Sequence, residues 1–331
     1  MEEFKKKLME LLAEQFDAER YSFREMEVVK NNDVTLHSIC VTKQDSVCGV
    51  NIYVEEMYSA YQILLRKAGN ENPWDKIMDE VVELIENKAD GDKTLPMMVV
   101  EALTDYEYMK DKVVFRLINA EKNKKFLANK AYLPFLDLAI CFYVLANEPE
   151  KEDTVASIAL PGDIVKEWGV SLEKLYEVAK QNMMRIFPSK IESLTDMLTG
   201  MMGNDSFSSF MNPPTLSGVV QEFYILTNQM GINGAAVLCY DSVIRGFSDE
   251  MEGSNFYILP SSIHEVILIP DTQSYAEGVD ELLAMVKEVN QTCVRLEEIL
   301  ADSVYYYERS QDKVVICAQC RMMEKTEREG E

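Results

Sequence analysis

The sequence predicts an α+β fold in which antiparallel sheets, formed as meanders, pack against pairs of helices. Short apolar runs with strand-like character occur in groups along the chain. Longer segments with apolar residues at helical spacing separate these groups, instead of alternating with single strands. Grouped strands pair with their sequence neighbours, so we expect antiparallel sheets rather than one doubly wound parallel sheet.

The N-terminal part of the chain predicts one helix, a three-stranded meander and a pair of helices. Phe4, Leu8 and Leu12 lie on one face of the opening helix, and the turn 31–33 joins the first two strands. The segment 69–73, which contains Gly and Pro, separates the paired helices. The expected elements are a helix at 4–16, strands at 24–30, 34–41 and 48–54, and helices at 55–68 and 74–87.

The middle of the chain predicts three strands followed by two helices. An acidic run at Glu148–Asp153 has the composition of a linker. We therefore expect an α+β N-terminal region at 1–150, an α+β C-terminal region at 151–320 and a charged tail at 321–331, with one integrated domain as the alternative. The expected strands are 113–118, 138–146 and 154–160, and the expected helices are 163–168 and 172–184.

Residues 222–270 are the most informative stretch and predict a sheet of at least three antiparallel strands. Asn233-Gly234 is a turn signal, from which we expect a hairpin between strands 222–227 and 235–240. A helix starting at about Asp241 should then precede the third strand. The other expected elements are a loop at 197–214, strands at 256–259, 266–269, 305–307 and 314–316, and a helix at 279–289.

Charge and cysteine content limit the class of protein. The 331 residues carry a net charge of -24, which argues against nucleic acid and anionic membranes as partners, because both are bound mainly through Lys and Arg. No apolar run reaches the roughly 20 residues that cross a bilayer. The seven cysteines show no disulfide-framework spacing, so we expect a soluble cytoplasmic protein with reduced thiols.

Two motifs have both a structural and a functional interpretation. Asp163–Asn182 resembles a helix-turn-helix, but acids and lysines balance on its second helix, which favours a structural hairpin over a DNA reader. Cys317 and Cys320 have the spacing of half a zinc site, yet the sequence offers no second ligand pair and only two histidines. A glycine-rich phosphate loop is also missing, so we expect neither a metal nor a cofactor.

The string Pro-Ser-Ser-Ile-His-Glu at 260–265 is the strongest candidate for chemistry. In a hydrolase, Ser261 or Ser262 would be the nucleophile, His264 the general base, and Asp271, Asp241 or Glu265 the carboxylate that orients the base. On an extended strand Ser262 and His264 share a face, whereas Glu265 points to the other face. The alternative is a structural corner whose hydroxyls cap backbone groups.

The Asn-Gly turn is the candidate binding edge. Asn228, Asn233 and Gly234 surround it, and the two alanines that follow allow a helix or a ligand to approach closely.

Five segments carry a resemblance to a known family. They are the Asn-x4-Asn-Gly-Ala string at 228–235, the Phe-Tyr-Ile-Leu-Pro-Ser-Ser-x-His-Glu string within 255–268, the segment 302–307, the segment 113–119 with Asn123, and the segment 135–140. Over most of its length the chain resembles an uncharacterised bacterial domain family of unknown function. The resemblance implies an intact α+β protein and runs across residue 150, but it implies no activity.

Two functional hypotheses follow. The first is a non-enzymatic acidic protein that binds a protein or small-molecule partner through the 228–271 face. The second is a hydrolase that uses Ser262, His264 and a nearby carboxylate. The environment of His264 distinguishes them: a pocket shared with a serine and a carboxylate favours the hydrolase, whereas a ring bonded to the backbone favours the structural corner.

Overall fold

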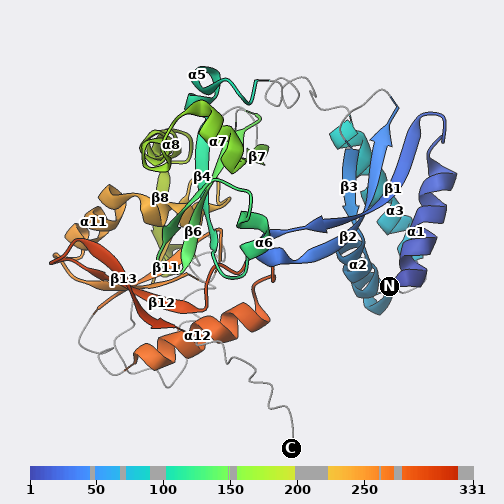
Figure 1. Cartoon of the computed structure of the whole chain (residues 1–331). Coiled ribbons are helices and arrows are strands. Elements are labelled where there is room, and N and C mark those ends of the chain that lie inside the picture. The colour runs from blue at the N-terminus through green and yellow to red at the C-terminus, as the bar shows by residue number, and fades with distance from the viewer. Residues whose placement is uncertain are drawn as a thin grey trace, which may run out of the picture. The chain divides into compact units, whose positions relative to one another are not determined.

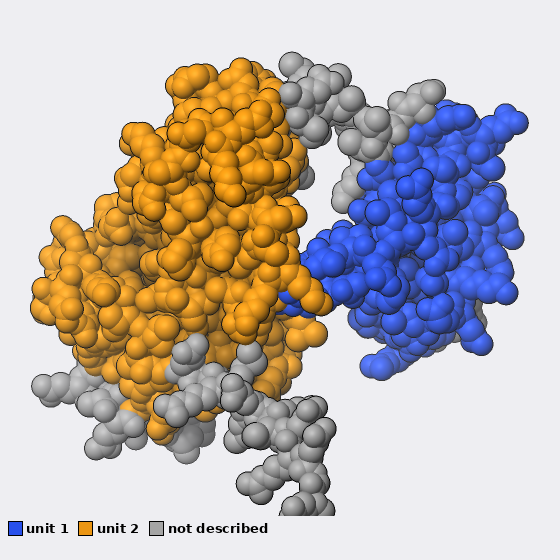
Figure 2. All heavy atoms as spheres, in the orientation of Figure 1, with its two compact units in different colours: residues 1–101 blue, residues 102–331 orange. Residues whose placement is uncertain are grey.

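The computed structural model describes residues 1–44, 49–67, 72–89, 102–147, 149, 155–197, 223–260, 262–271 and 278–319. The chain divides into two compact units, 1–101 and 102–331, which Figure 2 shows in different colours. Both units combine helices with antiparallel sheets, so the predicted α+β class is confirmed (Figure 1). The boundary that the sequence predicts near residue 150 falls inside the second unit.

Unit 1 is an antiparallel meander with the strand order β1-β2-β3 and three helices that share one core with it. Because side chains alternate along a strand, Ile39, Val41 and Ile52 point to the same face, where they pack with Leu8 and Ile77 of two helices. The elements expected here are all present: α1 (Glu2–Gln15), β1 (Tyr21–Val29), the 3-10 turn η1 (Asn31–Asp33), β2 (Thr35–Lys43), β3 (Gly49–Tyr53), α2 (Val54–Lys67) and α3 (Pro73–Ala89).

The first sheet of unit 2 is built around β6 (Leu138–Leu145), which is buried along its whole length. β4 (Val113–Asn119) pairs with one side of β6, and β5 (Tyr132–Phe135) and β7 (Ser157–Ala159) pair with the other. β7 follows the acidic run at 148–153 and still pairs with β6, so one sheet contains residues from both sides of the expected boundary.

Helices flank this sheet. α5 (Tyr106–Met109) and the 3-10 turn η2 (Lys110–Lys112) precede β4, and α6 (Lys124–Leu127) precedes β5. The expected helical hairpin is present as α7 (Gly162–Trp168) and α8 (Leu172–Ile186), with Gly169 at a φ of 66° between them. That left-handed conformation is one that glycine adopts without steric cost, which explains why the turn falls there.

The second sheet has the strand order β13-β12-β10-β11-β9-β8. α12 packs on one face through Leu282 and Val286, which contact Tyr257 and Leu259. On the other face Phe247 contacts Phe256. The elements are β8 (Ser189–Ser193), β9 (Tyr224–Asn228), the 3-10 helix η3 (Gly234–Cys239), α11 (Asp241–Glu250), β10 (Phe256–Leu259), β11 (Val266–Pro270), α12 (Val279–Thr292), β12 (Ser303–Glu308) and β13 (Lys313–Gln319).

The expected hairpin between 222–227 and 235–240 is wrong. Asn233 has the left-handed φ of 52° that the turn requires, but the chain continues as η3 instead of returning as a strand. β9 already pairs with β8 on one side and with β11 on the other, which leaves no edge for a further strand. The predicted three-strand antiparallel arrangement holds through β9, β10 and β11, and α11 lies between the first two of them.

Several sequence predictions fall on residues outside the described ranges. These are Ser261, Cys320, the charged tail and the loop at 197–214 beyond its first residue.

Candidate functional site

The corner at 260–265 joins β10 to β11 and is bonded through its backbone to two distant segments. The Ile263 N–H donates to the Glu298 carbonyl at 2.9 Å, and the Ala301 N–H donates to the Pro260 carbonyl at 2.9 Å. From the other side, the Ala235 N–H donates to the Ile263 carbonyl at 3.2 Å. The corner is therefore clamped between the start of η3 and the segment that leads into β12.

The Ser262 hydroxyl and the His264 ring each accept a hydrogen bond from a backbone N–H group and do not bond to each other. Ser262 is 5% exposed, and its hydroxyl oxygen accepts the backbone N–H of His264 at 3.0 Å. The Nδ1 atom of the His264 ring accepts the backbone N–H of Asn233 at 3.3 Å. Because Nδ1 is an acceptor, the neutral ring carries its proton on Nε2, which lies 3.8 Å from a carboxylate oxygen of Glu298.

None of the three carboxylates expected to orient His264 pairs with it in the described contacts. Asp241 begins α11, where its carboxylate lies 3.3 Å from the Lys180 ammonium. Asp271 lies beyond β11, five residues of strand or about 17 Å from the corner at 3.3 Å per residue, and it accepts the Tyr306 hydroxyl at 2.5 Å. Glu265 is half-buried at the start of β11. The carboxylate near the ring is that of Glu298, which the sequence did not single out.

The three expected binding residues are held inside the same corner. Asn228 is 1% exposed, donates to the Ile232 carbonyl at 2.8 Å and accepts the Met230 N–H at 3.0 Å. Asn233 supplies the N–H that the His264 ring accepts. Gly234 lies so close to its neighbours that an added Cβ would come within 2.4 Å of the His264 carbonyl oxygen. These residues build the corner, in which Asn228 and Gly234 are buried and Asn233 is half-buried.

A second polar cluster, which the sequence did not predict, lies between β4, α12 and β12. Asp137 accepts the hydroxyls of Ser303, at 2.5 Å, and of Tyr305, and Asn290 donates to Asp302 at 2.8 Å. Burial raises the pKa of Tyr305 well above its ordinary value, so its hydroxyl remains a donor. The available signal was the resemblance itself, since the segments 113–119, 135–140 and 302–307 meet here.

Asp302 in this cluster is held as a charged group. Burial by itself raises the pKa of Asp302, but hydrogen bonds from Lys122 and Asn290 outweigh it, so the pKa lies below its ordinary value. The Lys122 ammonium lies 2.8 Å from the carboxylate. Asn119 also donates to the Leu300 carbonyl at 3.0 Å, so the cluster ties the end of β4 to the segment before β12.

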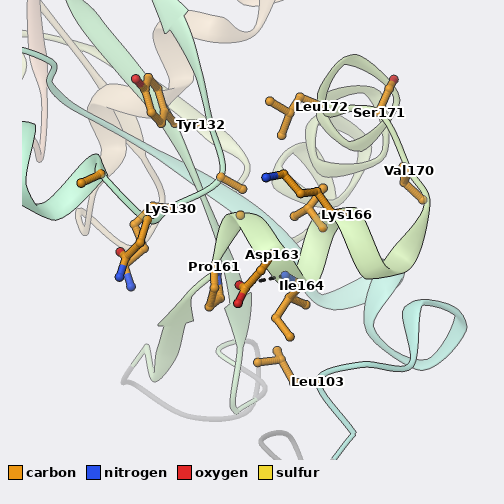
Figure 3. A pocket seen from close by; sticks show the side chains of 15 residues that line it. Leu103, Lys130, Tyr132, Pro161, Asp163, Ile164, Lys166, Val170, Ser171 and Leu172 are labelled. Carbon is orange, nitrogen blue, oxygen red and sulfur yellow. Dashed lines mark hydrogen bonds between the residues drawn. The ribbon is translucent and has the colours of Figure 1, made fainter.

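A pocket of about 930 Å³ opens beside β5 and the α7–α8 hairpin (Figure 3). Its volume is within the range of roughly 300–1,000 Å³ that small-molecule sites occupy. Apolar side chains supply much of the wall. The lining residues are Leu103, Ala128, Asn129, Lys130, Ala131, Tyr132, Pro161, Gly162, Asp163, Ile164, Val165, Lys166, Val170, Ser171 and Leu172.

Two lysines and one aspartate give the pocket its charge. Figure 3 shows Lys166 extending from α7 toward the middle of the pocket, whereas Lys130 lies on the β5 side. Within the described part of the chain, neither lysine forms an ion pair; the Lys130 ammonium lies 5.6 Å from the centre of the Phe126 ring. Asp163 accepts the backbone N–H of Ile164 at 3.0 Å in the first turn of α7.

Unit 1 contains the other histidine. His37 on β2 bonds through Nδ1 to Glu55 of α2 at 2.7 Å, and its backbone N–H donates to the same carboxylate at 3.1 Å. The hydrogen bond to Glu55 raises the pKa of His37. A smaller pocket of about 320 Å³ beside it is lined by Lys5, Glu25, Met26, Glu27, His37 and Ser38.

The described residues contain no cluster of three or more His, Cys, Asp or Glu side chains placed to hold a metal ion. Among them there is also no helix with the length and apolar character needed to cross a bilayer. Cys317 is exposed on β13.

Comparison with models of protein families gives a match. A family model described as a family of unknown function (DUF5688) matches residues 1–309, which include all of unit 1 and most of unit 2. Neither the curated proteins nor the solved structures contain a match. The match confirms the resemblance to a family without assigned activity that the sequence suggested. The chain therefore belongs to DUF5688, a family of unknown function.

Proposed function

We propose that this protein is a non-enzymatic binding protein and that the pocket beside β5 and α7 receives a small-molecule ligand. The observation that carries the proposal is the pocket itself, which has about 930 Å³, apolar walls and two lysines without ion-pair partners among the described residues. Ligand sites in proteins commonly combine a concave apolar wall with a few polar groups. The sequence favoured the 228–271 face, but Asn228, Ser262 and His264 of that face bond internally, so we place the site at the pocket.

The hydrolase alternative has less support. A serine nucleophile needs a hydrogen bond from its hydroxyl to the general base. The Ser262 hydroxyl instead receives the backbone N–H of His264, and the Nδ1 atom of the ring is used by Asn233. The first contact is that of a folded corner, in which a short polar side chain caps the backbone two residues ahead. The second joins the ring to the start of η3.

A dye titration tests the proposal. Phenylnaphthylamine, a neutral apolar dye, should bind with one site, and its emission should rise on excitation of Trp168. This tryptophan ends α7 and donates to the carbonyl of Leu103, a pocket residue, at 3.0 Å. A Trp74→Phe background leaves Trp168 as the only tryptophan donor. Ala128→Phe, which fills part of the pocket, should weaken binding without lowering the melting temperature.

Two results would contradict the proposal. One is the lack of any saturable dye binding to the folded protein, judged by its circular dichroism spectrum. The other is dye binding that the Ala128→Phe change leaves as tight as in the parent, because the dye would then occupy another surface.

A further inference from the structure

We infer that the ligand of this pocket is an organic anion with an apolar body, such as a carboxylate or a phosphate or sulfate monoester, and that Lys166 binds its charged group. The inference rests on the proposed function, since it names the chemical class that the pocket takes. It comes from the position of Lys166, whose ammonium extends into the pocket and forms no ion pair with the described residues.

Several lysines of unit 2 outside the pocket pair with acids, whereas Lys112, Lys174, Lys287 and Lys313 form no ion pair in the described contacts. The described ion pairs of unit 2 include Lys110 with Glu107, Lys122 with Asp302, and Lys190 with Glu192. Pairing of this kind is expected where acids outnumber bases by 57 to 33. Lys166 differs from the other lysines without an ion pair because its ammonium extends into a pocket, where a ligand carboxylate or phosphate has room to pair with it.

The surroundings of Lys166 define the shape of the ligand. Ile164 and Leu172 supply apolar wall on either side of its stem, and Leu103 supplies more from the segment before α5. Figure 3 shows Lys166 between Leu172 and the β5 side of the pocket. An ammonium at the end of an apolar stem keeps its charge available while its methylenes cover apolar surface. A ligand with an apolar body and one anionic end fits this arrangement, because its body would contact the apolar side chains and its anionic end would pair with the ammonium.

Asp163 supplies the negative charge of the pocket, and its removal should change the affinity for an anion in the opposite direction to the removal of the Lys166 charge. It lines the same pocket and lies three residues before Lys166 on α7, without an ion pair between them in the described contacts. Its Oδ1 atom accepts the Ile164 N–H at 3.0 Å. Asp163→Asn keeps an oxygen at this position and removes the negative charge, so it should strengthen anion binding and leave neutral ligands unaffected.

Two dyes with the same aromatic skeleton test the inference. Anilinonaphthalene sulfonate carries one negative charge, and phenylnaphthylamine carries none. We expect the anionic dye to bind more tightly than the neutral dye. Lys166→Gln should weaken the anionic dye about tenfold, which corresponds to ~1.4 kcal/mol, and leave the neutral dye unchanged. Lys130→Gln should give a smaller loss, because the Lys130 ammonium lies over the Phe126 ring, 5.6 Å from its centre.

Lys174→Gln is the matched control. It removes the same charge from the neighbouring helix α8 at an exposed position outside the pocket lining, so it should change the affinity of either dye less than twofold. Asp163→Asn should tighten the anionic dye alone.

The outcomes separate the inference from the proposed function. If the neutral dye binds in the pocket as tightly as the anionic dye, and Lys166→Gln changes neither, the ligand class is wrong although the binding function stands. If neither dye binds, both are wrong. If Lys174→Gln weakens the anionic dye as much as Lys166→Gln does, the effect reflects the overall charge of the protein, and the assignment of Lys166 is wrong.

Discussion

Gly234→Ala tests the structural role of the corner, because the glycine lies where a side chain cannot fit. A Cβ atom at this position would lie 2.1 Å from the Thr227 hydroxyl oxygen, 2.4 Å from the His264 carbonyl oxygen and 2.8 Å from the Asn228 backbone nitrogen. The hydroxyl can rotate, but only by giving up its 2.7 Å hydrogen bond to the His264 carbonyl. The other two atoms are backbone, so relief requires the start of η3 to move away from the corner.

The expected cost follows from these contacts. Overpacking of a buried site costs about 1–3 kcal/mol, and two backbone contacts place this change near the upper end of that range. The smaller conformational entropy of alanine in the unfolded chain returns about 0.4–1 kcal/mol. We therefore expect a net loss of about 2 kcal/mol, which lowers the melting temperature of a unit of this size by about 4–8 °C.

Gly246→Ala is the matched control with the opposite sign. Gly246 lies inside α11, and a Cβ atom there would have no neighbour within 4 Å. Alanine in a helix interior is more stable than glycine by about 0.5–1 kcal/mol, so this variant should melt slightly above the parent. Unfolding of unit 2 is followed by Trp168 fluorescence in a Trp74→Phe background. A Gly234→Ala protein as stable as the parent would refute the tight contact between η3 and the corner.

Three further predictions concern individual side chains. His264→Ala should lower the stability of unit 2 by about 1 kcal/mol, the low end for an unpaired donor, because the Asn233 N–H loses its acceptor; a melting temperature at or above that of the parent would favour a functional role for the ring. The lowered pKa of Asp302 means that its charge stabilises unit 2 above the unfolded pKa of about 3.9 and that this contribution is lost as the pH falls through the folded pKa. Asp302→Asn should therefore make the stability of unit 2 depend less on pH in the acid range. An unchanged pH dependence would contradict the lowered pKa of Asp302. The raised pKa of His37 means that its pairing with Glu55 stabilises unit 1 fully below the unfolded pKa of about 6.5 and that this stabilisation fades as the pH rises through the higher folded pKa. The stability difference between the parent and His37→Gln, followed by Trp74 fluorescence, should therefore shrink as the pH rises. A difference that grows with pH would show that the ring is bound neutral.

Segments whose own pattern of apolar residues indicates burial were predictable from the sequence. The apolar run 138–145 is long enough for only one buried strand, and α8 has the apolar spacing of a helix packed on one side. β5 was missed because it is short, contains Pro134 and exposes Tyr132, which together look like a loop. Proline is tolerated there because β5 lies at the edge of its sheet.

The error at 235–240 had a different origin. Six apolar residues after an Asn-Gly turn fit a returning strand as well as a buried 3-10 helix, and local pattern cannot decide between them. The conformation of 235–240 depends on β8 and β11, which pair with both edges of β9 and come from distant parts of the chain.

The candidate sites also show that local sequence patterns do not predict contacts between distant segments. The short spacing between Ser262 and His264 made a local corner predictable, because a serine caps the backbone two residues ahead. The partners Asn233 and Glu298 were not predictable, since they reach the ring from other elements. The pocket was missed for the same reason, because its walls come from three separate segments around Leu103, 128–132 and 161–172.

The structure of the protein in complex with anilinonaphthalene sulfonate would test the central claim most directly. The account predicts one dye molecule in the pocket beside β5 and α7, with its sulfonate within ion-pairing distance of the Lys166 ammonium and its rings against Ile164 and Leu172. It also predicts that the bonds of Ser262 and His264 stay as they are without the dye. A dye bound at the 228–271 face, or a Lys166 that pairs with a carboxylate of the protein while the pocket stays empty, would contradict it.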